Sequence, residues 1–160
     1  MRVGLGFDVH PFSDDADGRA LVLGGVTFAG ERGLAGHSDA DVVAHAVADA
    51  LLGAAGQGDL GQHFPDTDPA WAGADSLVLL GRVCQVVAAA GWRPVNVDCR
   101  VVLEAPRLAP HRDAMQHRLS AVVGADVTVG AKRAEGLGAL GRGEGVACWA
   151  VALVERDAPA

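Results

Sequence analysis

The segment at residues 39–55, DADVVAHAVADALLGAA, constrains the fold of this chain most strongly. Its alanine and leucine content, together with acidic residues at its start, predicts an α-helix. Valine and alanine surround its few polar positions and leave little room for a broad solvated face. We therefore expect this helix to be largely buried, with any polar stripe facing a site.

The rest of the chain alternates between short predicted strands and helices without an internal repeat. Strands are expected at 2–10, 95–104, 125–131 and 146–154, a hairpin at 21–25 and 26–29, and further helices at 74–90 and 110–123. This order indicates an α/β or α+β layer, and the fold expected is α+β: a four-stranded mixed sheet with helices on one face, as in a ferredoxin-like layer, plus the short hairpin. The other sheet face would stay apolar, and one chain of 160 residues cannot cover it, so oligomerisation is expected.

Composition narrows the functional classes. A length of 160 residues predicts a single domain over 1–160, and a net charge of −7 argues against nucleic-acid binding through a general basic field. No signal peptide and no apolar run long enough for a bilayer are recognised, so no membrane association is expected. Cys84, Cys99 and Cys148 lie among apolar residues and form no CxxC pair, which favours buried thiols and a cytoplasmic location.

Asp8 and His10 lie two apart on the first predicted strand, so both side chains leave the same side of it. Such a pair by itself is more typical of a polar surface. With His45, however, it offers one oxygen and two nitrogen ligands, and three ligands leave the fourth zinc position open, as in catalytic sites. The alternative is that His45 is a histidine whose hydrogen bonds are satisfied within its own helix.

The predicted helix at 39–55 places Asp41, His45 and Asp49 on one stripe, so the two carboxylates are candidate partners for fixing the imidazole tautomer. His37 and Ser38 precede the helix, where free backbone N–H groups favour a phosphate. The remaining histidines, His63, His111 and His117, have no companion at ligand spacing and are expected on the surface or in loops.

Two glycine-rich segments complete the candidate site. The loop at 57–72 carries Asp59, Asp66 and Asp68, which either hold hydroxyls or a hydrated metal, or only stabilise turns. The segment at 130–145, GAKRAEGLGALGRGEG, lacks the glycine spacing and the GK[ST] end of a P-loop, but basic residues among glycines are a reasonable anion cradle.

Taken in order, these clusters resemble the methylerythritol cyclodiphosphate synthase family along nearly the whole chain. The resemblance is carried by GFDVHPF (6–12), HSDADVVAHAVADALLGAAGQGDLGQHFPDTDP (37–69), GADS (73–76), NVD (96–98), EAPRLAPH (104–111) and GRGEG (141–145). It implies an enzyme, a phosphorus–oxygen lyase, that acts on 4-diphosphocytidyl-2-C-methyl-D-erythritol 2-phosphate. The 2-phosphate attacks the β-phosphorus, CMP leaves, and the cyclic diphosphate remains.

The resemblance also implies cofactors and an assembly. One zinc ion per subunit would be bound by Asp8, His10 and His45, and a magnesium or manganese ion would lie near Glu135. The chain would form a homotrimer with its sheets packed around the threefold axis and active sites between subunits. Metal ions would neutralise the meeting phosphates and align attack with departure.

The family's functional positions transfer onto this sequence as follows. His37 and Arg133 fall at positions that stabilise the transition state. The substrate-binding positions are Asp8, Val9, His10, His37, Ser38, Asp59, Leu60, Gly61, Phe64, Pro65, Asp66, Thr67, Asp68, Leu103, Glu104, Ala105, Pro106, Arg107, Leu108, Ala109, Lys132, Arg133, Ala134, Glu135 and Arg142.

One segment departs from the family pattern. A threonine run usually precedes the glutamate, whereas here Lys132, Arg133 and Ala134 precede Glu135, and Ala139 replaces an expected aromatic residue. Either the cations replace hydroxyl contacts with charge, or the loop is rearranged. Two other functions stay open on this basis: a zinc-dependent hydrolase of nucleotide diphosphates, and a non-catalytic trimer that binds isoprenoid diphosphates along its axis near Arg142 and Glu144.

Overall fold

A computed structural model describes residues 1–14 and 18–157. Its strands are β1 (Arg2–Pro11), β2 (Ala20–Leu23), β3 (Val26–Arg32), β4 (Trp92–Val102), β5 (Asp126–Lys132) and β6 (Gly145–Arg156). Its helices are α1 (Val42–Ala55), α2 (Leu60–His63), α3 (Ser76–Ala89), α4 (Arg112–Val123) and α5 (Gly138–Gly141), with 3₁₀ turns at Pro69–Trp71 and Ala109–His111. The predicted order of strands and helices is therefore confirmed.

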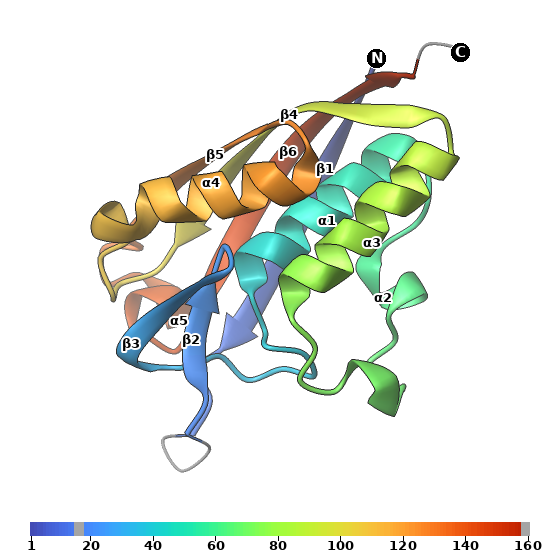
Figure 1. Ribbon diagram of the computed structural model, residues 1–160. Helices are drawn as coiled ribbons and strands as arrows, with labels where there is room; N and C mark the ends of the chain where they lie inside the picture. Colours follow the sequence, from blue (N-terminus) through green and yellow to red (C-terminus); the bar gives the residue numbers. More distant parts are fainter. Residues whose placement is uncertain (15–17, 158–160) are drawn as a thin grey trace.

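The sheet is four-stranded and mixed, in the order β1-β6-β4-β5. Strand β6 runs antiparallel to both β1 and β4, whereas β4 and β5 are parallel. The helices α1, α3 and α4 cover one face of this sheet, and the β2–β3 hairpin stands beside them (Figure 1). This is the expected α+β layer with helices on one face.

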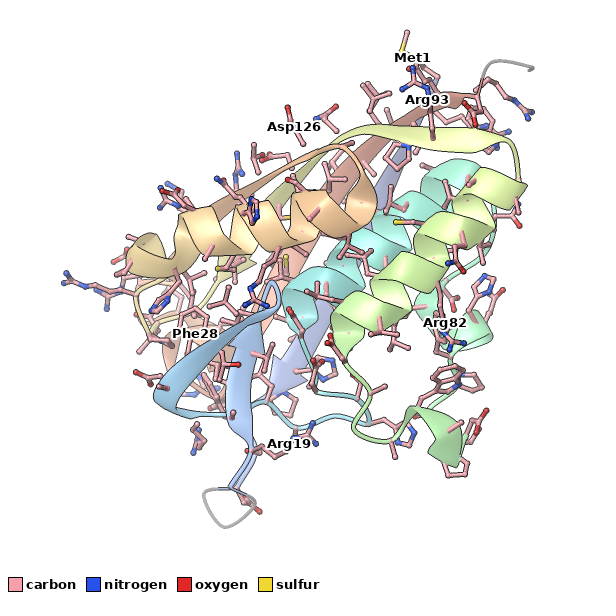
Figure 2. All side chains as sticks on the ribbon, viewed as in Figure 1. Met1, Arg19, Phe28, Arg82, Arg93 and Asp126 are labelled. Atoms are coloured by element: carbon pink, nitrogen blue, oxygen red, sulfur yellow. The ribbon has the colours of Figure 1, made fainter. Side chains whose placement is uncertain are left out.

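The hairpin turns through Gly24 and Gly25, both left-handed with φ of 58° and 72°. Two consecutive left-handed residues are what a two-residue hairpin turn of the right twist requires, and glycine adopts them without steric cost. Phe28 of β3 lies between the hairpin and α4, where its ring centroid is 4.3 Å from that of His111 (Figure 2). The hairpin is thus packed on the domain, next to the start of α1.

Helix α1 lies unusually close to β1. A Cβ atom added to Gly6 would come within 2.0 Å of the Ala46 carbonyl oxygen, and one added to Gly4 equally close to that of Ala50. The even-numbered residues of β1 face α1, so these two glycines let the helix backbone rest directly on the strand. Helix α1 is almost wholly buried, as its composition predicts.

The opposite face of the sheet is open and apolar on its β1 and β6 side. The large exposed apolar side chains there are Val3, Leu5, Phe7, Val9, Trp149 and Val151. The β4 and β5 side is polar instead: Asp98 accepts hydrogen bonds from Thr128 Oγ1 at 2.6 Å and from Arg100 Nη1 at 2.5 Å. An uncovered apolar face is therefore present, as predicted from the single set of helices.

Within residues 1–14 and 18–157, the helices are all too short or too polar to span a membrane.

Candidate active site

Three side chains from β1 and α1 converge at one end of the sheet. Asp8 Oδ2 lies 3.0 Å from His10 Nε2 and 3.0 Å from His45 Nδ1. The two imidazole nitrogens are 3.4 Å apart. One carboxylate oxygen and two imidazole nitrogens, all within 4.8 Å of one another, form a candidate metal-binding triad, and this donor set fits a divalent cation.

The local structure explains this convergence. Alternation along β1 places Asp8 and His10 on the same side as Gly4 and Gly6, which face α1. Because α1 rests on β1, His45 in its first turns reaches the end of the strand. His10 donates a hydrogen bond from Nδ1–H to the Ala35 carbonyl at 2.9 Å, which leaves the Nε2 lone pair directed at the triad.

The triad couples the ionisation of its members. Burial alone would raise the pKa of Asp8, but hydrogen bonding and charge interactions with His10 and His45 lower it well below the usual range. Burial acts to lower the pKa of His45, and the hydrogen bond and charge of Asp8 outweigh it and raise that pKa. The triad therefore holds an ionised carboxylate beside a basic imidazole, and a bound cation would replace the imidazole proton.

The second nitrogen of His45 meets hydroxyl groups rather than carboxylates. His45 Nε2 lies 2.9 Å from Ser76 Oγ and 3.1 Å from Ser38 Oγ. The expectation that Asp41 and Asp49 flank this imidazole is wrong. The helix begins at Val42 rather than at residue 39, so Asp41 is its N-cap and does not belong to a stripe.

Asp41 joins the start of α1 to the hairpin. It is fully buried, and its carboxylate accepts hydrogen bonds from Val43 N at 3.0 Å and Ala44 N at 3.1 Å, which caps the helix. It also accepts from Gly24 N at 2.8 Å and Gly25 N at 2.6 Å. Burial raises the pKa of this carboxyl, and the backbone hydrogen bonds oppose the rise.

Asp49 does face the site, but its hydrogen bond positions a loop. Its Oδ1 accepts from the backbone N–H of Leu60 at 2.7 Å, at the beginning of α2. Burial raises the pKa of Asp49, and the Leu60 hydrogen bond partly offsets this. The aspartate therefore ties the loop after α1 to the pocket wall.

The triad lies in a pocket of about 540 Å³. Its lining residues are Asp8, His10, Gly36, His37, Ser38, His45, Asp49, Leu60, Gly61, Phe64, Pro65, Asp66, Trp71 and Leu79. The rings of Phe64 and Trp71 meet edge to face with centroids 5.0 Å apart, and Arg82, projecting from α3, lies over Trp71 (Figure 2). The pocket thus has a polar floor and an aromatic wall.

The residues before α1 are held from two sides. His37 donates from Nε2–H to the Asp68 carbonyl at 2.8 Å, which links the loop to the aspartate-rich segment. Arg19, labelled in Figure 2, donates to the carbonyls of Gly36, at 2.7 Å, and of Ser38. Sequence reasoning did not single out Arg19, because its partners are backbone atoms about 20 residues away and leave no side-chain motif.

A second pocket, of about 180 Å³, gathers the predicted nucleotide-binding residues. It is lined by Leu103, Glu104, Pro106, Arg107, Leu108, Ala109, Arg112, Ala131, Lys132 and Arg133. Arg133 donates to Glu104 Oε2 from Nε at 2.9 Å and from Nη2 at 2.8 Å. The Arg133 hydrogen bond lowers the pKa of Glu104. Among the described residues, the two pockets have no lining residue in common.

Other predicted site residues lie outside these two pockets. Val9 points to the open sheet face, Asp59 caps α2, and Asp68 caps the turn at Pro69–Trp71. Thr67, Ala105 and Glu135 are exposed, and Ala134 is half-buried. Arg142 forms an ion pair with Glu144, with Nε and Oε1 2.6 Å apart. Glu135 is left-handed, with φ of 53°, a conformation that strains a residue with a side chain.

The remaining histidines and the cysteines lie apart from the triad. His63 donates to the Gln57 carbonyl at 2.8 Å, and His117 is exposed on α4. Cys99 and Cys148 are buried, and burial raises the pKa of the Cys84 thiol to about 11. All three thiols are unpaired, as expected, and Cys84 is a poor nucleophile at neutral pH.

Comparison with known proteins assigns this chain to a family. Residues 1–155 match the YgbB family, and the chain belongs to that family. It is 56% identical over 159 residues to the 2-C-methyl-D-erythritol 2,4-cyclodiphosphate synthase of Bordetella petrii, covering 98% of this chain and 96% of that protein. The synthase of Rubrobacter xylanophilus is 55% identical over 97% of this chain and 95% of its own length.

Solved structures agree in fold. The bifunctional IspDF of Campylobacter jejuni superimposes with a TM-score of 0.91 at 37% identity, over 97% of this chain and 42% of that protein. A 2C-methyl-D-erythritol-2,4-cyclodiphosphate synthase in its CDP-bound form superimposes with a TM-score of 0.85 at 36% identity, over 96% of this chain and all of that one. The four-stranded mixed sheet is therefore the fold of synthases of this family.

Proposed function

We propose that this chain is a metal-dependent 2-C-methyl-D-erythritol 2,4-cyclodiphosphate synthase, a phosphorus–oxygen lyase. The observation that carries the proposal is the Asp8, His10 and His45 triad in the main pocket, on a chain that matches named synthases over nearly its full length. In the reaction, a 2-phosphate oxygen of 4-diphosphocytidyl-2-C-methyl-D-erythritol 2-phosphate bonds to the β-phosphorus. The bond from that phosphorus to the CMP oxygen breaks, and CMP leaves with the electron pair.

Zinc is the proposed ion at the triad, one per chain. A tetrahedral zinc about 2.0–2.1 Å from its ligands places those ligand atoms roughly 3.3–3.4 Å apart. The three separations here, 3.0, 3.0 and 3.4 Å, are close to this geometry. When bound, the ion supplies charge neutralisation for the phosphates through its open fourth position. Magnesium or manganese is proposed for a second ion near Glu135, bound mainly through substrate phosphates.

The side chains of the main pocket are proposed to hold the methylerythritol phosphate. The free N–H groups expected before α1 are not available to a phosphate, because Asp41 already caps Val43 N and Ala44 N. His37 and Ser38 nevertheless line the main pocket, and His37 is proposed to stabilise charge as the β-phosphorus is attacked. The 59–61 and 64–68 segments hold the methylerythritol hydroxyls. Holding both reacting ends of one molecule together supplies effective concentration.

The product distinguishes this function from its alternatives. Purified protein is incubated with the substrate, zinc and magnesium, and the products are separated by chromatography. CMP together with the cyclic diphosphate is the expected result. CMP with a linear product would instead assign a hydrolase, and binding without turnover would assign a diphosphate-binding module.

A homotrimer with active sites between subunits is the proposed assembly, and the cytoplasm, where unpaired thiols persist, the proposed compartment. The open apolar face on β1 and β6 supports an oligomer. The main pocket lies beside edge strand β1, and the nucleotide pocket lies at the end of β4 and of the other edge strand, β5. Subunit contact would bring the nucleotide pocket of one protomer to the main pocket of its neighbour.

Changing Trp149 to Asp should break this assembly. Trp149 lies on the open face and is 39% exposed in the single chain, so a carboxylate there would be buried on association. Light scattering should give three times the 16.3 kDa chain mass for the wild type and one chain mass for the inactive variant. Val78→Asp is the matched control, since Val78 is exposed on α3. An active wild-type monomer would refute the shared site.

Arg133 is proposed to contact the diphosphate, and Lys132 to support CMP or its phosphate. Glu104 holds the guanidinium group of Arg133 at the rim of the nucleotide pocket. The N–H groups of Arg133 that do not bind Glu104 can donate to an anion. Arg133→Ala should lower kcat by about 10- to 1000-fold, as for loss of one preorganised donor. Arg133→Thr should recover part of the rate.

Arg93→Ala is the control for Arg133, because Arg93 also pairs with a glutamate, Glu155, but at the beginning of β4. Its kinetics should match those of the wild type. Unchanged kinetics of Arg133→Ala at low ionic strength, where charge effects are largest, would show that the Arg133 side chain serves only the ion pair.

A further inference from the structure

We infer that Ser76 and Asp39 are positioning residues that hold His45 in its Nε2–H form and so present the Nδ1 lone pair to the metal ion. The inference rests on the proposed metal site. It assigns a role to two residues that lie in the segments 37–69 and 73–76, where neither has yet been given a function, and that do not line the main pocket. We therefore assign their effect to His45 rather than to contact with a substrate.

The direction of the hydrogen bonds follows from the groups involved. Ser76 Oγ–H donates to the Asp39 carboxylate, which also accepts from Ser76 N at 3.2 Å. A carboxylate has no proton to give, so the single hydroxyl proton of Ser76 points at Asp39. Ser76 Oγ then presents a lone pair to His45 Nε2, 2.9 Å away. Between these two residues His45 Nε2 is therefore the donor, and Nδ1 faces Asp8 and His10.

Burial makes this chain of hydrogen bonds effective. Ser76 is 1% exposed, so water does not compete for its hydroxyl. The Asp39 backbone N–H donates to the Ala74 carbonyl at 3.0 Å, which pins the loop before α1 to the loop before α3. Ser38 Oγ accepts from Ala40 N and lies 3.4 Å from Ser76 Oγ, which can accept the Ser38 hydroxyl proton. With its proton so placed, Ser38 Oγ, 3.1 Å from Nε2, is a second acceptor for the imidazole proton.

The two histidines of the triad are thus fixed in opposite tautomers by different partners. His10 gives its Nδ1–H to a backbone carbonyl, which no substitution removes. His45 depends on the side chains of Ser76 and Asp39, so its orientation is open to mutation. Outer partners of metal-bound histidines typically contribute 10- to 100-fold to metal affinity.

The test measures metal affinity rather than turnover. Zinc dissociation constants are measured by competition with a chromophoric chelator for the wild type, Ser76→Ala, Asp39→Asn and Ser76→Thr. Ser76→Ala and Asp39→Asn should each weaken zinc binding by about 10- to 100-fold, and Ser76→Thr, which keeps the hydroxyl, should restore most of it. The control is Asp75→Ala, which removes the cap of α3 at Leu77 N without reaching His45. Its affinity should be unchanged.

A second measurement needs no variant. Long-range ¹H–¹⁵N spectra of the wild-type protein report which imidazole nitrogen of His45 is protonated, and Nε2–H is expected in both the metal-free and zinc-bound states. Unchanged affinity in Ser76→Ala, an equal loss in Asp75→Ala, or a His45 proton confined to Nδ1 would each overturn the inference. A wild-type protein that binds no zinc would overturn the metal site itself, and the inference with it.

Discussion

Replacing His45 with alanine should remove the metal ion and abolish CMP release while the chain stays folded. His45 supplies one of two nitrogen ligands, and Asp8 and His10 alone leave a pair too weak to hold zinc. Metal charge stabilises the transition state by several kcal/mol, so loss of the ion should lower kcat by on the order of 1000-fold or more. Metal analysis should give one zinc per wild-type chain and none in the variant.

His117→Ala is the matched control, because His117 is an exposed histidine on α4. It should keep both zinc and activity. Asp8→Asn should also lose zinc and activity. Asp8 is more exposed than His45, so this variant tests the triad even if the cavity left by His45→Ala disturbs folding. Full zinc occupancy in a folded His45→Ala protein would refute the assignment of the triad.

Replacing Asp41 with alanine should destabilise the chain more than any other single carboxylate change suggested by the structure. Loss of the α1 cap costs about 1 kcal/mol. The N–H groups of Gly24, which is buried, and of Gly25, which is half-buried, would also lose their acceptor, at about 1–3 kcal/mol each with Gly25 at the lower end. The expected fall in the free energy of unfolding is therefore about 4 kcal/mol, to be measured by urea denaturation in the presence of a chelator so that metal binding does not contribute.

Asp75→Ala provides the comparison for Asp41, because Asp75 caps α3 through one hydrogen bond at an exposed position. Asp75→Ala should lower the free energy of unfolding by about 1 kcal/mol. The loss of unfolding free energy in Asp41→Asn should lie between those of Asp41→Ala and Asp75→Ala. An amide retains one acceptor oxygen but turns an N–H group towards Gly25 N. A loss in Asp41→Ala no greater than that in Asp75→Ala would show that the hairpin contacts contribute nothing.

Much of the fold could be predicted from hydrophobic periodicity and from the glycine and proline residues that separate the elements. The alternation in 2–10 and the alanine-rich run before residue 55 predicted β1 and α1 to within a few residues. The start of α1 was misplaced because Asp39 and Asp41 resemble first-turn acids, whereas they lie before the helix and accept backbone hydrogen bonds. Which N–H groups they meet depends on the hairpin, and the sequence of α1 carries no information about that contact.

The candidate site was predictable where its members share an element. Asp8 and His10 are two apart on one strand, His45 was added to them as a possible third ligand from its residue type, and the resemblance implied the same set. Ser76 lies in the GADS segment (73–76) but was given no role, because its contacts with Asp39 and His45 span 37 and 31 positions. A serine is also common as the first residue of a helix, so its presence there did not indicate that it positions His45. Within α3 itself, the signal was a small polar residue at a position where the apolar pattern of the helix predicts burial.

The glycines of β1 bear on the chemistry as well as on packing. Three ligand atoms can meet within a few ångströms only if the backbones that carry them approach closely, and Gly4 and Gly6 provide that approach by having no side chain. A methyl group at position 6 would lift α1 from the strand and carry His45 away from Asp8 and His10. The spacing of the three candidate ligand atoms therefore depends on two residues outside the triad, so a substitution at a strand glycine is expected to alter metal binding without changing a ligand.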